Sequence, residues 1–157
     1  MFTFILNCLE FLILSGYFVI AAQGVFYHLV LGRVFMKIPT ADFLELRQAT
    51  DRYIRRPLKV FYVSTPLLML TGIVLGIGHL SLTASLCMGI ALLLLLLDIR
   101  LILRSSEPIN QLVNQLTDLP NVEGGNNLQH AWVQTMLRRG YFNGMGFLSL
   151  IVGQVFG

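Results

Sequence analysis

The chain has 157 residues, of which 55% are hydrophobic and 12% are charged, and its mean hydropathy is +0.73. Ordinary soluble domains carry about twice that share of charged residues, so the composition excludes this class. The basic residues outnumber the acidic ones, but they flank apolar stretches and are mixed with acids, which argues against a nucleic-acid partner. The composition therefore predicts one integral membrane domain over residues 1–157, whose first partner is the lipid bilayer.

Uncharged windows divide the chain into membrane spans. Between Glu10 and Arg33 lie 22 residues without a charge, between Lys59 and Asp98 lie 38, and after Arg139 follow 18. The middle window is interrupted by the turn-like sequence at 76–81. A membrane helix needs about 20 mainly apolar residues. We therefore predict an all-α fold, an integral membrane four-helix bundle, with spans over about 4–31, 58–76, 82–103 and 141–156.

Within the first span, polar and small residues recur every three or four positions. At about 100° per residue they share one helix face. Polar side chains are costly in hydrocarbon and small ones permit close helix contact, so this face is predicted to turn toward the bundle. The length of the uncharged window leaves Glu10 near the outer interface, so Glu10 and Tyr17 are weaker site candidates than His28. The complete stripe is Glu10, Leu14, Tyr17, Ala21, Gly24 and His28.

The first of two cytoplasmic segments covers 33–57. Pro39 restricts the residue before it and predicts a helix break, after which Thr40 is suited to cap a new helix. Residues 41–56 mix apolar and charged side chains and are too polar to span, so we predict a short amphipathic helix near the headgroups. Pro57 is expected to start the second span, since its missing N–H is harmless at a helix start.

The second cytoplasmic segment covers 104–139. Pro108, with the polar residues around it, predicts a break at 105–110, and the helix is expected to resume over 111–119. A loop over 120–127 precedes another amphipathic helix, which starts near Asn127 and continues into the last span. The helix that contains this span has small residues at spacings that favour close packing: Gly140, Gly144 and Gly146.

All 11 Lys and Arg residues lie in or beside these two segments, and none lies at either terminus or in the 76–81 turn. The positive-inside rule then places both segments in the cytoplasm and both termini outside. The expected location is a bacterial-type inner membrane, crossed several times. Cys8 and Cys87 fall near the same end of their helices, and the sequence leaves open whether they are bridged.

Sequence motifs assign no cofactor. The chain contains no P-loop, GxGxxG, CxxC, HExxH or Glu-x-x-His pattern, so nucleotide, zinc and di-iron sites have no support and no metal ligands are assigned. Both His28 and His130 are predicted on the cytoplasmic side, where a pair of imidazoles could hold haem or a metal. Haem or metal binding therefore stays an alternative, and the cofactor is unknown.

Polar and aromatic residues gather at the predicted cytoplasmic level of several helices. Arginine beside aromatic rings suits an anionic or phenolic aromatic ligand, so these residues could form a pocket for a lipophile. Alternatively, they only tie the helices together at the headgroup level. The pocket candidates are Gln23, Tyr27, His28, Asp98, Arg100, Asn110, Trp132 and Arg139.

Several of these residues resemble those of the anthrone-oxygenase-like family of small four-span membrane proteins, most of which have no assigned function. The glycine and aromatics at 24–27, the Glu-Pro-Ile-Asn segment at 107–110, and Trp132 with Arg139 carry the resemblance. Met136 stands where many members have histidine. The resemblance implies oxidation of a polycyclic anthrone to a quinone by O₂ without a cofactor, with His28 as the base and Arg139 as the partner of the anion.

Three functions follow as hypotheses. The first is a small membrane protein that acts as a non-enzymatic subunit or scaffold and binds lipid, another membrane protein or a second copy of itself. The alternative is a cofactor-independent oxidoreductase acting on an aromatic or quinone-like lipophile. The second alternative is a haem or metal binder. The sequence leaves open whether the protein is an enzyme, what its ligand is and how it assembles.

Overall fold

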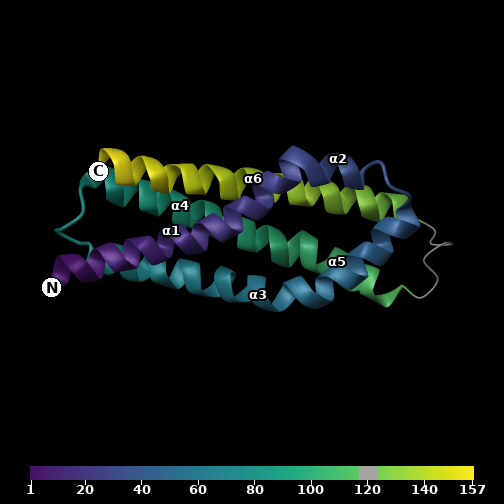
Figure 1. Ribbon diagram of the computed structural model, residues 1–157, viewed down its shortest axis with the longest axis horizontal. Coiled ribbons are helices and arrows are strands. Elements are labelled where there is room, and N and C mark those ends of the chain that lie inside the picture. The colour runs from purple at the N-terminus through teal and green to yellow at the C-terminus, as the bar shows by residue number, and fades with distance from the viewer. Residues whose placement is uncertain (117–123) are drawn as a thin grey trace.

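The computed structural model describes residues 1–116 and 124–157, and within these ranges every regular element is helical. Four long helices lie side by side along one axis (Figure 1): α1 (Phe2–Phe26), α3 (Thr40–Leu75), α4 (Leu82–Leu101) and α6 (Gly125–Phe156). α1 contacts α3 and α6, and α4 contacts the same two helices. Both termini and the 76–81 turn lie at one end of the bundle. The predicted all-α fold is confirmed.

Three stretches of the described chain are long and apolar enough to cross a membrane: Phe4–Phe35, Thr40–Leu75 and Leu82–Gln115. Large apolar side chains such as Phe11, Phe18 and Leu93 are each more than half exposed on the outside of the bundle. A water-soluble protein rarely exposes so much contiguous apolar surface, so these helices suit a lipid environment. The predicted fourth span lies in α6, which is not one of these three stretches. Polar residues such as Asn143 interrupt its apolar sequence.

The chain turns where Pro39 predicts a break. α1 continues through a π-helical turn, Tyr27–Leu31, into α2 (Gly32–Phe35), and α3 begins after Pro39. Thr40 is the first residue of α3 and not its cap, so the predicted capping role is wrong. Its hydroxyl instead donates to Gln129 Oε1 at 2.8 Å. Gln129 also donates to the Phe35 carbonyl, so this turn is fastened to α6.

α3 runs unbroken through Pro57, so the predicted helix start at this residue is wrong. A proline inside a helix loses one backbone hydrogen bond, and the packing of the segment before it compensates. Phe43 and Leu44 are fully buried, and Gln48 Nε2 donates to the Val113 carbonyl at 2.7 Å. With 36 residues α3 is about 54 Å long, so its first half extends well beyond the roughly 30 Å of hydrocarbon.

The predicted break at 105–110 is also wrong. α4 continues through a π-helical turn, Ile102–Ser106, into α5 (Glu107–Gln115). Pro108 lies in the first turn of α5, where a proline is tolerated, and the wider π turn before it accommodates the ring. α6 then starts at Gly125 and continues to Phe156 as one helix, as expected from about Asn127. Residues 117–123, which include parts of the predicted helix and loop, lie outside the described residues.

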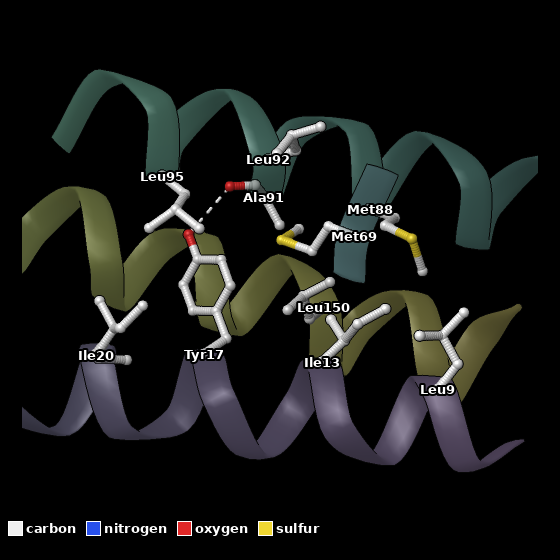
Figure 2. Packing of buried hydrophobic residues seen from close by; sticks show 11 residues of the cluster. Leu9, Ile13, Tyr17, Ile20, Met69, Met88, Ala91, Leu92, Leu95 and Leu150 are labelled. Atoms are coloured by element: carbon white, nitrogen blue, oxygen red, sulfur yellow. Dashed lines mark hydrogen bonds between the residues drawn. The ribbon is translucent and has the colours of Figure 1, made fainter. Parts of the chain in front are cut away.

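Two apolar clusters hold the bundle together. The first fills the half nearer the termini (Figure 2), where Tyr17 is fully buried and its hydroxyl donates to the Ala91 carbonyl at 3.0 Å. The second is rich in aromatic rings and joins α2, α5 and the first half of α3 to α6. Trp132 lies at its centre, with the Phe43 ring 5.5 Å away edge to face. Its buried members are Tyr27, Phe35, Phe43, Leu44, Val113, Trp132, Val133 and Met136.

Candidate binding cavity

A cavity of about 410 Å³ opens beside the aromatic cluster and is lined by residues of α1, α3, α4, α5, α6 and both π-helical turns. One part of its lining is apolar and comes from α3, the end of α4 and the adjoining turn. The other part carries amide, aromatic and charged groups. Such a cavity suits a molecule that is apolar over one part and polar over another. The residues of the apolar part are Ile54, Leu58, Val63, Ile99, Ile102 and Leu103.

A buried ion pair lies at one side of the cavity. Asp98 of α4 is fully buried, and Arg139 Nε of α6 donates to its Oδ1 at 2.8 Å. Its other oxygen accepts from Tyr62 Oη at 2.8 Å and from Asn143 Nδ2 at 2.9 Å. Because a buried carboxylate is stable only when it is paired and hydrogen-bonded, these contacts fasten α3 and α6 to α4.

Each nitrogen of Arg139 has a partner within the protein. Besides the bond of Nε to Asp98, Nη2 donates to Tyr62 Oη at 2.8 Å. Nη1 lies 3.4 Å from Ser106 Oγ and 3.5 Å from Met136 Sδ. Although Arg139 lines the cavity, its guanidinium is held within the protein by partners from three other elements and by Met136 of its own helix. In the protein without a ligand, Arg139 therefore holds the elements of the cavity wall together.

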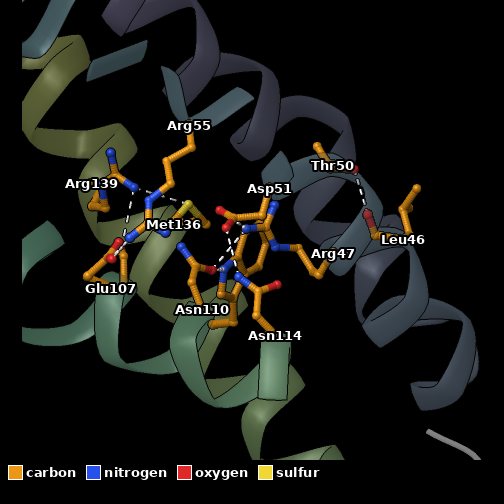
Figure 3. A network of polar contacts seen from close by, with 12 residues as sticks. Leu46, Arg47, Thr50, Asp51, Arg55, Glu107, Asn110, Asn114, Met136 and Arg139 are labelled. Carbon is orange, nitrogen blue, oxygen red and sulfur yellow. Dashed lines mark hydrogen bonds and ion pairs between the residues drawn. The ribbon is translucent and has the colours of Figure 1, made fainter. Parts of the chain in front are cut away.

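Arg47 forms a second polar cluster (Figure 3). Its Nη2 donates to Asn110 Oδ1 at 2.9 Å and lies 3.5 Å from Asp51 Oδ1. The guanidinium carbon lies 4.4 Å from the centre of the Trp132 ring, a cation–π contact. Trp132 Nε1 donates to the same Asn110 oxygen at 3.0 Å, and Asn114 donates to Asp51 at 2.9 Å. All of these except Asn114 line the cavity.

Most of the residues predicted for the pocket lie at this cavity. Asp98 lies directly behind Arg139, to which it is bonded. His28 does not line the cavity. Its Nε2 lies 2.7 Å from the Leu137 carbonyl oxygen, and its ring packs against Tyr141 between α1 and α6. The predicted residues that line the cavity are Gln23, Tyr27, Asn110, Trp132 and Arg139.

The remaining predicted residues lie elsewhere. Arg100 is exposed near the end of α4. Tyr17 belongs to the apolar cluster nearer the termini. Glu10 lies near the end of the bundle that carries the termini, where its Oε2 accepts from Gln154 Nε2 at 3.3 Å. None of the three is part of the cavity lining.

The sequence reasoning missed Arg47, Asp51, Tyr62 and Asn143. Tyr62 and Asn143 are isolated polar residues within predicted spans, and such residues usually face the bundle interior, so a search for them would have found both. Arg47 and Asp51 gave no such signal. They lie on a cytoplasmic helix among other charged residues, where most side chains face water.

Metal-ligating side chains do not gather in the described part of the chain. Over residues 1–116 and 124–157 no group of three or more His, Cys, Asp or Glu residues could hold a metal ion. Cys8 and Cys87 are both free thiols. His130 is exposed on α6, and His28 is held by the Leu137 carbonyl.

Comparisons with known proteins assign no family. No family model matches this chain, and neither the curated proteins nor the solved structures contain a match. The resemblance to the anthrone-oxygenase-like family therefore stays a prediction from the sequence. The geometry of the cavity carries the functional argument.

Proposed function

We propose that this protein is a four-span membrane protein that binds an amphipathic lipophile in the cavity. The observation that carries the proposal is the lining, which joins exposed apolar residues at the outside of the bundle to buried polar residues inside it. Val63 and Leu103 line the cavity and are also exposed, so an alkyl chain could pass between them from the hydrocarbon. Of the functions predicted from the sequence, lipid binding by a non-enzymatic protein agrees best with this geometry.

Bound lipophile is the direct test. We expect protein purified by mild extraction to carry one lipophile per chain, identified by mass spectrometry, that differs from the bulk phospholipid. Leu58→Trp fills the cavity and should abolish this ligand. Val60→Trp, on the same helix but outside the lining and 64% exposed, should retain it. Equal lipid content in all three proteins would contradict the proposal.

The proposal includes the orientation predicted from charge, with α6 as the fourth span and both termini outside a bacterial-type inner membrane. Both termini lie at the same end of the bundle, opposite the aromatic cluster (Figure 1), which supports an even number of spans. We expect alkaline phosphatase fused after Gly157 to be active and a fluorescent protein fused there to be dark, with the reverse result after Lys37. Fluorescence at the C-terminus would contradict the orientation.

An oxidoreductase acting on an aromatic lipophile is the second candidate. The aromatic rings of Tyr27 and Trp132 in the cavity lining support it. The base suggested by the family resemblance, His28, lies outside that lining, which weakens this candidate. Incubation of the purified protein in air separates the two functions. A binding protein returns its lipophile unchanged, whereas an increase in the mass of the ligand or a loss of two hydrogen atoms would favour the enzyme.

A further inference from the structure

Arg47 is a buried cation with unused hydrogen-bond donors. Only 6% of the residue is exposed, yet its Nε has no hydrogen-bond partner in the described part of the protein. Of the other two nitrogens, only Nη2 bonds to protein groups within residues 1–116 and 124–157. Buried donors are almost always paired, and Arg47 lines the cavity. A ligand in the cavity is therefore within reach of these donors.

The other cavity arginines are already paired. Arg139 uses all three of its nitrogens within the protein, and Arg55 forms an ion pair with Glu107. Among the carboxylates of the described residues, Arg47 contacts only Asp51, at the long distance of 3.5 Å. The guanidinium packs over the Trp132 ring and donates to Asn110, so the group is held in place before any ligand binds. This arrangement is typical of a recognition site, in which the donors are preorganised.

The charges around the cavity also favour an anion. Four basic and two acidic side chains line it, and the buried Asp98 balances Arg139 from behind. Within the described residues, one positive charge is therefore left without an acidic counterpart. Lys59 lines the cavity and forms none of the ion pairs found within the described residues. A cavity with this excess attracts negative charge.

We propose that the lipophile carries an anionic oxygen head, a carboxylate or a phosphate group, which binds to the guanidinium donors of Arg47 that have no partner among the described residues. This inference rests on the proposed lipid-binding function and names its ligand class. Arginine is protonated at any physiological pH and binds both groups through charge-assisted hydrogen bonds. The alkyl chain then lies along Leu58 and Leu103 toward the hydrocarbon.

The protein contains a suitable reporter of binding, because its single tryptophan, Trp132, lines the cavity. The full chain in nanodiscs of zwitterionic lipid is titrated with hexadecanoate, hexadecyl phosphate and hexadecanol while its fluorescence is recorded. We expect both anions to bind about tenfold or more tightly than the alcohol, the difference typical of one charged hydrogen bond. Equal binding of the alcohol would overturn the anionic head. Because this comparison uses the wild-type protein, it does not depend on any variant folding.

Variants then assign the preference to Arg47. Arg47→Gln should reduce the preference for the anions to below about twofold, while Arg47→Lys, which keeps the charge, should retain part of it. Arg52→Gln, on the same helix but exposed and outside the lining, should leave it unchanged. A full preference in correctly folded Arg47→Gln would overturn the assignment.

Two further outcomes distinguish a failure of this inference from a failure of the proposed lipid-binding function. If the wild-type protein binds the alcohol as tightly as the anions and Leu58→Trp blocks all three, the cavity binds lipophiles and only the anionic head is wrong. If Leu58→Trp changes no titration, the lipid-binding function itself fails. If acetate or inorganic phosphate alone saturates the site at the concentrations used for the amphiphiles, the site binds free anions. This result would overturn the proposal that the ligand is a lipophile.

Discussion

Asp98→Asn is expected to lower the free energy of unfolding by about 3 kcal/mol, the loss typical of a buried charge pair from which one partner is removed. The substitution leaves the Arg139 cation, only 9% exposed, without a negative partner. It also weakens the acceptor for Tyr62 and Asn143. Reversible unfolding of the purified protein in mixed micelles, followed by circular dichroism, measures the change.

Two further variants test whether charge is the cause of this loss. Tyr62→Phe removes no charge but loses the hydrogen bond to Asp98 and the one accepted from Arg139, and it should cost about 2 kcal/mol. The double variant Asp98→Asn with Arg139→Gln removes both charges and should recover part of the loss, because no unpaired charge remains buried. A double variant less stable than Asp98→Asn alone, or a Tyr62→Phe loss as large as that of Asp98→Asn, would show that the charge pair is not what stabilises this contact.

Gly140→Ala is expected to destabilise the protein by about 2 kcal/mol, as overpacking of a tight contact does. α1 and α6 touch through their backbones at this point, and a Cβ on Gly140 would lie 2.8 Å from the Gly24 carbonyl oxygen and 2.6 Å from the His28 ring. The reciprocal change has no more room, since a Cβ on Gly24 would lie 2.6 Å from the Gly140 Cα. The midpoint of thermal unfolding in micelles is the measurement.

Gly144→Ala is the matched control, one turn further along the same helix. Nothing lies within 4 Å of a Cβ at this position. Alanine is the better helix former by up to about 1 kcal/mol, so this variant should be unchanged or more stable. Opposite signs for the two substitutions are therefore expected. If both stabilise the protein, the close contact of α1 with α6 is not present in solution.

Periodicity identified the side of the first span that faces the bundle. Tyr17 and Ala21 of the predicted stripe are buried, and Gly24 contacts α6. The sequence predicts the buried side of a helix because the positions that share one side depend only on the 3.6-residue turn. The same reasoning treated Gly140, Gly144 and Gly146 alike, although Gly144 faces open space. Composition indicates which residues permit close contact, but the partner helix determines which of them make it.

Continuity of the helices depended on tertiary packing. Pro57 and Pro108 were both expected to interrupt or start a helix, and the chain continues as helix at both. Local rules weigh the lost backbone hydrogen bond and the ring clash. They omit the buried contacts of Phe43, Leu44 and Gln48 with neighbouring elements, which hold the first half of α3 in line with the second.

The sequence by itself determined that the chain is helical and apolar enough to cross a membrane, because composition and charge-free length are local properties. It also indicated that Tyr27, Asn110, Trp132 and Arg139 could share one site. Only the tertiary structure distinguished the two arginines at that site. Arg139 is paired with Asp98 across the bundle, whereas Arg47, beside Trp132, keeps donors that no described residue accepts from. The physical reason is that pairing depends on which side chains from other helices come within bonding distance, and a sequence does not contain those distances.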